Sequence, residues 1–226
     1  MTVDPKTLAA YIDHTLLKPD ARREAIEKLC FEARKYGFYS VCVNGQWVSL
    51  CKELLDGTPV KVAAVVGFPL GAGKSEVKAF EAAEAVEDGA SEIDMVLPIG
   101  SLLDGDYDAV RNDIAHVVEA VSGSAIVKVI METGFLSDEQ IVAACKLSEE
   151  AGAHFVKTST GFGPGGATVE HIRLMRASVS PSIGVKASGG VRDAQAAQAM
   201  IEAGATRLGT SSGVAIINGI QGSSTY

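Results

Sequence analysis

The chain has 226 residues, a formal net charge of -8 and four cysteines. This length suits one large domain with a substantial core, and the acidic balance argues against nucleic acid as a partner, because nucleic-acid binders usually carry a basic surface. The cysteines lack CxxC or Cys/His spacing, so the sequence indicates neither a zinc site nor a disulfide framework.

The N-terminal residues MTVDPKTLAA contain no basic segment followed by an apolar stretch. No apolar run reaches the roughly 18 residues that a membrane span needs. Reduced cysteines are typical of the cytosol. We therefore expect a cytoplasmic protein without a membrane partner.

Strands and helices alternate along the chain. After a short helix that begins at Asp4 and Pro5, apolar runs predict strands at residues 12–17, 38–43, 60–68, 92–97, 125–131, 154–160, 182–188 and 206–211. Helical spacing and helix-end signals predict helices at residues 21–37, 46–55, 74–88, about 106–121, 168–177 and 193–203. A capping box at Ser137 and Gln140 predicts the start of one more helix.

This alternation predicts a (β/α)8 TIM barrel, an α/β fold, formed as a single domain over residues 1–226. The strand segments are nearly continuous apolar runs, as in a parallel sheet that is covered on both sides. The related segments EDGASEIDMV, EAGAHFVKTS and EAGATRLGTS place Gly89, Gly152 and Gly204 where a left-handed residue would end a helix. A doubly wound open sheet is the alternative, although the glycine-rich dinucleotide fingerprint is missing after the first strand.

Lys157 lies in the apolar run HFVKTST, and a lysine is seldom buried unless a partner or a chemical role requires it. The alternative is a lysine on a solvated face or one that extends along apolar surface. Two more strand segments carry a lysine directly after a valine, Lys128 and Lys186. The repetition favours a functional role for this group.

Ionisable residues fall on the predicted strands, and barrels of this class place the active site at the C-terminal ends of the strands. Asp13 and Asp94 join the three lysines in these segments. Asp94 has an alternative interpretation as a carboxylate that merely pairs with a buried lysine, but converging ionisable groups favour function. The histidines share no ligand spacing, so we expect neither a metal nor a cofactor.

Glycine-rich segments follow the last two strands, KASGGVRD and GTSSG. Barrels of this class bind phosphate at this position through backbone N–H groups. Turn formation alone is the alternative explanation. We favour a substrate or phosphate site, and its candidate residues are Gly161, Gly189, Gly190, Ser211 and Ser212.

Seven segments, taken together and in order, resemble the deoxyribose-phosphate aldolase family: IDHTLLKP, SVCVN, EIDMVLP, VKVIMETG, FVKTSTGF, VKASGGVRD and LGTSSG. The resemblance runs from residue 12 to the C-terminus. It implies a class I, metal-free aldolase that cleaves 2-deoxy-D-ribose 5-phosphate into acetaldehyde and D-glyceraldehyde 3-phosphate. The partner would be this small phosphosugar, and we expect a homo-oligomer, with a dimer favoured.

The resemblance also implies residue roles. Lys157 would form the Schiff base, Lys186 would be the second lysine, and Asp94 would be the catalytic carboxylate. The supporting residues would be Asp13, Thr15, Lys128 and Tyr226. Phe162 departs from the pattern, because some members have a lysine directly after KTSTG and use it at the phosphate.

Schiff-base chemistry sets a requirement on Lys157. An amine attacks a carbonyl only when it is unprotonated, and a free lysine with a pKa of about 10.4 is almost wholly protonated at pH 7. A second ammonium about 4 Å away, at an effective dielectric constant near 20, would contribute roughly 4 kcal/mol and lower the pKa by about 3 units. Lys186 is the candidate for that ammonium, and desolvation would act in the same direction.

Two other functions fit the same residues. A different Schiff-base aldolase or transaldolase would share the lysine but differ in the residues that contact the sugar. A non-catalytic phosphosugar-binding barrel would keep the glycine loops while its lysines stay protonated.

Overall fold

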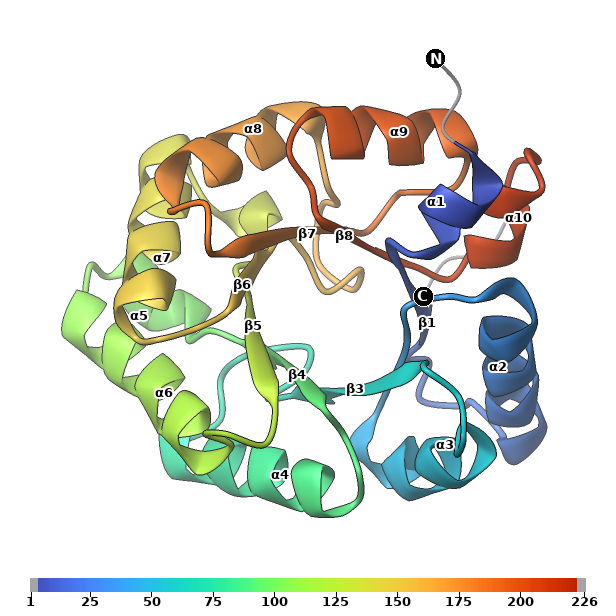
Figure 1. The fold of residues 1–226 in the computed structure, drawn as a ribbon. Coiled ribbons are helices and arrows are strands. Elements are labelled where there is room, and N and C mark those ends of the chain that lie inside the picture. Colours follow the sequence, from blue (N-terminus) through green and yellow to red (C-terminus); the bar gives the residue numbers. More distant parts are fainter. Residues whose placement is uncertain (1–3, 223–226) are drawn as a thin grey trace.

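The structure of the protein is a computed structural model that describes residues 4–222. The strands pair in parallel in chain order, and β1 also pairs with β8, so the sheet closes into a barrel (Figure 1). The strands are β1 (Ile12–Leu16), β2 (Ser40–Val43), β3 (Lys61–Val66), β4 (Glu92–Val96), β5 (Ile126–Ile130), β6 (Phe155–Lys157), β7 (Gly184–Ser188) and β8 (Arg207–Thr210).

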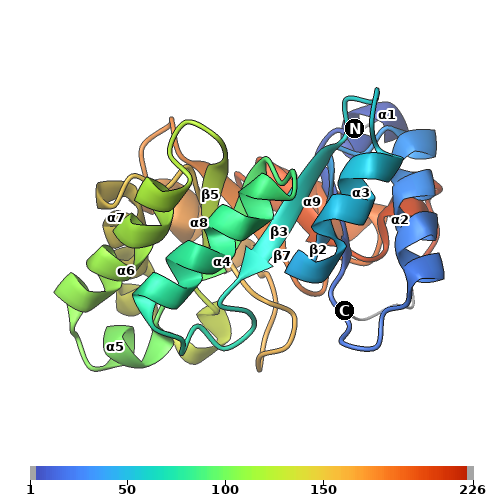
Figure 2. The ribbon, with the colours of Figure 1, turned by 90° about the horizontal axis from the view of Figure 1, so that it is seen from below.

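Helices surround the barrel on its outer side (Figure 1), and from the side several of them cover the strands (Figure 2). The α-helices are α1 (Pro5–Ala9), α2 (Arg23–Tyr36), α3 (Val48–Leu54), α4 (Ser75–Glu87), α5 (Ile99–Leu103), α6 (Tyr107–Ala120), α7 (Asp138–Glu150), α8 (Val169–Ser178), α9 (Ala194–Glu202) and α10 (Gly213–Ile217). Two short 3-10 helices are η1 (Gly45–Trp47) and η2 (Thr133–Phe135). Within residues 4–222, no helix combines the length and the apolar character that crossing a membrane requires.

The predicted barrel and its eight strands are confirmed. The capping box at Ser137 and Gln140 is present, and Asp193 accepts a hydrogen bond from the N–H of Ala196. The prediction was wrong in some details, and two of them concern a helix start and a strand end. Asp4 precedes α1 but makes no side-chain capping bond, and the sixth strand ends at Lys157 rather than at residue 160.

Hydrophobic packing lies mainly between the strands and the helices, because alternate strand residues point outward. Val41, Ile93, Val129, Val156 and Leu208 are fully buried there. Inside the barrel Leu17, Cys42, Ala63 and Val65 form a small apolar cluster. Much of the remaining interior is occupied by polar and charged side chains.

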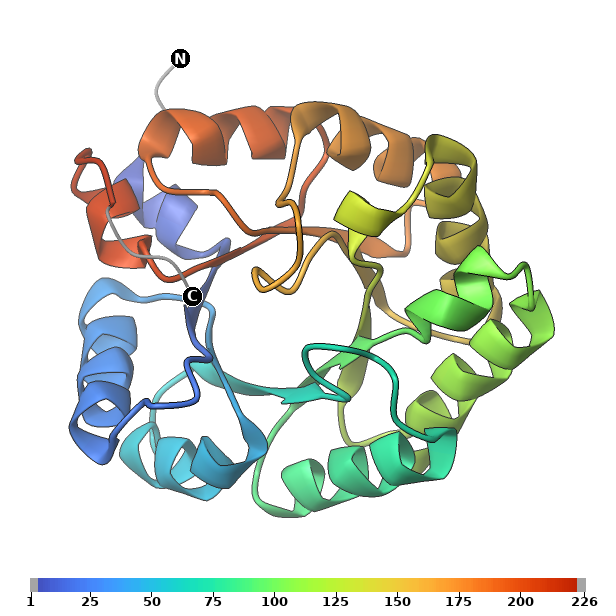
Figure 3. The same cartoon turned by 180° about the vertical axis from the view of Figure 1, so that it is seen from behind.

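The loops that follow the strands gather at one end of the barrel. Figure 3 looks onto this end, where the loops after β3 and β6 reach over the opening. Phe68, after β3, meets Phe162, after β6, edge to face with ring centroids 5.4 Å apart. The backbone of Gly166 approaches that of Gly189 so closely that a Cβ on Gly166 would collide with it. The loop after β6 is thus held between the loops after β3 and β7.

The ion pair between α4 and α6 allows a test of buried charge. Lys78 donates to Asp113 at 2.8 Å and to the carbonyl of Val96 at 3.0 Å, and both charged side chains are buried. Asp113→Ala leaves the Lys78 ammonium buried without its carboxylate, which costs about 3–5 kcal/mol. We expect thermal unfolding to shift down by roughly 6 to 20 °C.

The matched control is Asp108→Ala on the same helix, since Asp108 pairs with Arg111 at the surface. This change should cost less than about 1 kcal/mol. Equal losses in the two variants would contradict the assignment of α4–α6 packing to the buried pair.

Candidate active site

Asp94 is the centre of a group of buried charges inside the barrel. One oxygen accepts from Lys128 at 2.7 Å, and the other accepts from Lys157 at 2.7 Å and from Lys186 at 2.8 Å. The strand register explains the convergence, because Asp94 pairs with Lys128, and Lys157 pairs with Lys186. Paired residues of neighbouring strands point to the same side of the sheet. Four strands therefore bring three amines to one carboxylate.

Two further carboxylates lie next to this group. Asp13 pairs with Lys186 at 2.5 Å, and Glu92 pairs with Lys128 at 2.6 Å. The Arg207 guanidinium joins the two, at 3.0 Å from Asp13 and 3.1 Å from Glu92. The guanidinium also stacks on the ring of Tyr39, with 3.4 Å to the ring centroid. These contacts fix Asp13 and Glu92 beneath the lysines.

Burial and charge act differently on the two neighbouring lysines. The pKa of Lys157 is lowered, first because burial disfavours the ammonium and then because the Lys186 charge repels it, while Asp94 acts in the opposite direction. Burial also disfavours the Lys186 ammonium, but the Asp13 and Asp94 charges outweigh it and hold the pKa of Lys186 well above its ordinary value. The amine of Lys157 is therefore the one that can become neutral.

The carboxylates of Asp94 and Asp13 remain ionised. Burial would raise the pKa of Asp94, but the charges of Lys128, Lys157 and Lys186 hold this pKa well below its ordinary range. Burial would also raise the pKa of Asp13, but nearby charges, chiefly that of Lys186, hold this pKa below its ordinary value. The network joins four basic side chains to three carboxylates. A neutral Lys157 leaves three formal positive and three formal negative charges, which is the balanced state for a buried site.

The structure brings together five of the predicted residues, Asp13, Asp94, Lys128, Lys157 and Lys186. Thr15 lies on β1 two residues after Asp13 and is buried, but its hydroxyl donates to the backbone carbonyl of Asp13 at 2.8 Å and to none of the lysines. Tyr226 lies outside the described residues.

Sequence reasoning missed several members of the site. Glu92 and Arg207 belong to the charge network, and their signal was present, since each is an ionisable residue on an apolar strand at the inward position. Ser159 and Ser188 lie two residues after Lys157 and Lys186. Their buried hydroxyls have no hydrogen-bond partner within residues 4–222, so they are available to polar groups of a bound molecule.

The proposed phosphate loops lie close together after β7 and β8. Gly189 and Gly190 have φ of 82° and 83°, which favours glycine. The Thr210 hydroxyl donates to the carbonyl of Val191 at 2.7 Å and accepts from the N–H of Ser212 at 2.9 Å. Thr210 thus joins the two loops, and Ser211 lies between Thr210 and Ser212 in the chain. Gly161, with φ of 86°, turns the loop after β6.

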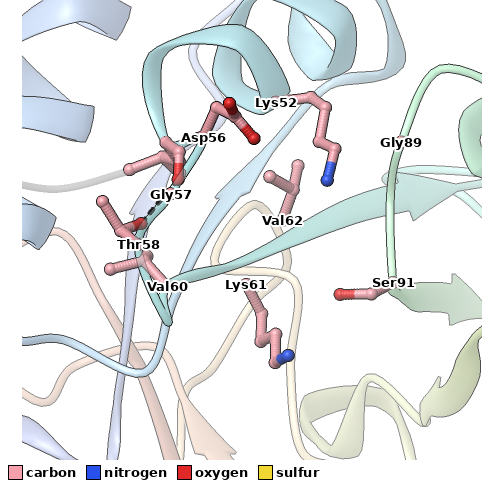
Figure 4. A pocket seen from close by; sticks show the side chains of 10 residues that line it. Lys52, Asp56, Gly57, Thr58, Val60, Lys61, Val62, Gly89 and Ser91 are labelled. Carbon is pink, nitrogen blue, oxygen red and sulfur yellow. Dashed lines mark hydrogen bonds between the residues drawn. The ribbon is translucent and has the colours of Figure 1, made fainter.

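Two hollows differ in position and lining. A pocket of about 330 Å³ at the mouth is largely apolar, and Phe162 is in its wall together with Leu70, Phe135, Glu132 and Thr160. Figure 4 shows another, of about 190 Å³, lined by Lys52 on α3, Lys61 on β3 and Ser91 before β4. The residues that begin strands line the second hollow, so it lies at the end opposite the mouth. Within residues 4–222 no group of three His, Cys, Asp or Glu side chains is arranged to hold a metal ion.

The arrangement can perform carbonyl chemistry. A neutral amine adds to an aldehyde, and the resulting iminium needs a nearby anion. Lys157 supplies the amine and Asp94 the anion at 2.7 Å. A closed parallel barrel whose strands carry a reactive amine next to a carboxylate is typical of barrel enzymes.

Comparison with known proteins gives the family. Residues 7–219 match the model of the DeoC/LacD family aldolase, and the chain belongs to this family. A deoxyribose-phosphate aldolase of Geobacillus sp. is 58% identical, over 97% of this chain and 98% of its own. One of Brevibacillus brevis is 61% identical, over 92% and 94%. The solved tetrameric deoxyribose-phosphate aldolase of Aeropyrum pernix is 36% identical, with a TM-score of 0.89 over 95% of this chain and 91% of its own.

Replacing Lys186 tests the electrostatic origin of the Lys157 reactivity. Lys186→Leu removes a repelling charge and leaves Asp94 with one cation fewer, and both changes raise the pKa of Lys157. The rate of its reaction with an aldehyde, followed against pH, should shift upward by at least about one pH unit. Burial, the first cause of the lowered pKa, is unchanged, so part of the lowering should persist.

Lys186→Arg is the matched control, because it keeps the charge but cannot readily pass on a proton. A near-normal pH profile in this variant assigns Lys186 a field effect, and impairment of both variants at every pH assigns it a proton-transfer role. An unchanged profile in Lys186→Leu would remove Lys186 from the activation of Lys157.

Proposed function

We propose that the protein is a class I aldolase that reversibly cleaves 2-deoxy-D-ribose 5-phosphate to acetaldehyde and D-glyceraldehyde 3-phosphate. The observation that carries the proposal is Lys157, a buried amine with a lowered pKa that lies against Asp94 and beside a charged Lys186. The relatives named deoxyribose-phosphate aldolase support the choice of substrate. The reaction makes the enzyme a lyase of deoxyribose phosphate catabolism.

Lys157 acts as the nucleophile in this mechanism. Its neutral amine adds to the C1 aldehyde of the open-chain sugar, and loss of water gives the iminium. Electrons of the C2–C3 bond then move into the iminium to form a two-carbon enamine, while the C3 hydroxyl loses its proton and becomes the aldehyde of D-glyceraldehyde 3-phosphate. Protonation of the enamine at C2 and hydrolysis release acetaldehyde and restore the amine.

The charges around Lys157 serve successive stages of this cycle. Lys186 disfavours the free ammonium, and Asp94 stabilises the iminium, which carries the same charge at the same nitrogen. Asp94, Lys186 and a water molecule would transfer the protons of the C3 hydroxyl and of C2. Lys128, Asp13 and Arg207 hold Asp94 and Lys186 in position through the contacts already described.

The substrate phosphate would bind the loops after β7 and β8, near Gly189, Gly190, Ser211 and Ser212. Left-handed glycines and the start of the short helix α10 at this end of the barrel support the assignment. Phe162 cannot supply a cation, so the backbone and the hydroxyls of these loops would carry more of the binding. Ser159 and Ser188 would contact the sugar hydroxyls.

The cellular setting and assembly belong to the same proposal. We assign the enzyme to the cytoplasm, where reduced cysteines persist, and the four cysteines at positions 30, 42, 51 and 145 are free. We also propose a homodimer, supported by Val77 and Phe80, two exposed apolar residues on one face of α4. Sedimentation of the purified protein tests the dimer.

Reductive trapping tests the function. Acetaldehyde and borohydride should add about two carbons to Lys157 of the wild-type protein, as located by mass spectrometry. Lys157→Met should lose the label and the activity, whereas the control Lys61→Met, at the opposite end of the barrel, should keep both. Labelling and activity that survive in Lys157→Met would refute the nucleophile assignment.

The same assay separates the other two functions. A wild-type protein that binds the phosphosugar but is never labelled is a binding barrel. A wild-type protein that is trapped by larger donor aldehydes or ketones, but not by acetaldehyde, is a different Schiff-base enzyme.

Gly190 tests the phosphate site. A Cβ at Gly190 would meet no atom within 4 Å, so Gly190→Val collides with nothing, although it strains the left-handed backbone there, and it fills space at the proposed phosphate. We expect KM to rise at least about tenfold for deoxyribose 5-phosphate and little for free deoxyribose. Gly105→Val is the control, because Gly105 also has a positive φ, 76°, and open surroundings. Equal effects on both sugars would make the loop structural only.

A further inference from the structure

The backbone contains a bulge where β5 leaves the barrel next to Lys157. Met131 N–H donates to the carbonyl of Lys157, and Thr133 N–H donates to that of Thr158, both at 3.0 Å. In a regular parallel ladder the second bond would reach Ser159, two residues after Lys157. One extra residue, Glu132, is therefore inserted on the β5 side. Bulges next to active sites commonly redirect a side chain.

Glu132 has the geometry of such a redirected residue. Its φ is 55°, the sole positive φ at a non-glycine position within residues 4–222. A glutamate in the left-handed region costs free energy that glycine would avoid. The side chain is nonetheless buried, with 2% exposure. The conformation is therefore kept because of what the carboxylate contacts.

The carboxylate binds the loop that follows Lys157, the last residue of β6. It accepts a short hydrogen bond from the Thr160 hydroxyl and two longer ones, both 3.3 Å, from the Thr160 N–H. The Thr160 hydroxyl in turn accepts from the N–H of Phe162 at 3.0 Å. Gly163 completes the enclosure, because a Cβ there would lie 2.7 Å from the carboxyl carbon of Glu132.

These bonds keep the backbone after Thr158 out of the sheet. Thr160 directs its N–H to the Glu132 side chain, which follows β5, rather than to a neighbouring strand. The loop also carries Ser159 and Gly161, and it holds one ring of the Phe68–Phe162 contact. A shift of Thr160 would thus be transmitted to Lys157, three residues earlier, and to both sides of the mouth.

We propose that Glu132 and Thr160 form a positioning pair that sets the direction of the Lys157 amine by fixing the loop after β6. Neither residue needs to touch the substrate. The inference rests on the proposed function, because Lys157 must be the reacting group. Burial raises the pKa of Glu132, while the Thr160 bonds and the Lys157 charge oppose the rise, in agreement with a carboxylate that is enclosed by this loop.

The test compares two replacements of Thr160 in the full chain. Thr160→Val keeps the shape but removes the hydroxyl, and Thr160→Ser keeps the hydroxyl but removes the methyl group. The readouts are the rate at which acetaldehyde and borohydride label Lys157, the separate values of kcat and KM, and the thermal unfolding curve. Ser137→Ala is the control, since it alters the exposed cap of α7 just after the same bulge.

Thr160→Val should label Lys157 and turn over at least about tenfold more slowly than wild type, with KM changed less than about threefold, because misplacement of the nucleophile affects the reacting state more than binding. Thr160→Ser should recover to within about threefold of wild type. Ser137→Ala should label at the wild-type rate, although its unfolding temperature falls.

Labelling at the wild-type rate in Thr160→Val, with a lower unfolding temperature, would overturn the proposal and leave the pair a purely structural role. Equal impairment of the Val and Ser variants would also overturn it, since shape rather than the hydroxyl would then matter. If Thr160→Val does not fold, Glu132→Met decides, because it keeps the length of the side chain but removes both acceptor oxygens. Slower labelling of folded Glu132→Met supports the pair, and unchanged labelling overturns it. A wild-type protein that is not labelled refutes the proposed function instead.

Discussion

The convergence of Lys128, Lys157 and Lys186 on the Asp94 carboxylate is the interaction on which the site depends. Three ammonium groups cannot share one buried anion without strong repulsion. The carboxylates of Asp13 and Glu92 relieve the repulsion at Lys186 and Lys128 but make no ion pair with Lys157. The lysine with the weakest ionic support is thus the one that loses its proton. The nucleophile is selected by the uneven distribution of partners around Asp94.

The barrel makes this distribution durable. The charged residues lie on six strands, and each strand is fixed by its two neighbours in the closed sheet. Rearranging one ion pair would require slipping a strand, which would turn its whole outward apolar face inward. The apolar packing between strands and helices therefore holds the charges in place. A barrel interior filled with apolar side chains would be more stable, but it would lack the reactive amine.

Much of this could be predicted from sequence, for identifiable reasons. Apolar runs and helix-end signals predict the strands and helices of the barrel, because periodicity and caps are local properties of the sequence. Lysines in apolar strands identify the site, because an unpaired buried lysine is costly. The short helices α5 and α10 were missed, since five residues give almost no periodic signal. Arg207 and Glu92 are also ionisable residues on apolar strands, but their pairing with each other spans the barrel and depends on strand register.

The bulge at Glu132 marks the limit of sequence reasoning. Nothing local predicts a left-handed glutamate, because the conformation is imposed by Thr160 and Gly163, about 30 positions further along the chain. The order of causes behind the Lys157 pKa also depends on the folded structure. The sequence pointed first to repulsion by Lys186, whereas burial is the larger cause in the folded barrel.

The most direct measurement is an NMR titration of the lysine side chains in protein labelled with carbon-13 at the lysine Cε, with Lys157 assigned through Lys157→Arg. The account predicts that Lys157 loses its proton below the ordinary lysine value of about 10.4, while Lys186 stays protonated beyond it. A Lys157 signal that titrates at or above the ordinary value, with Lys186 titrating below it, would contradict the account.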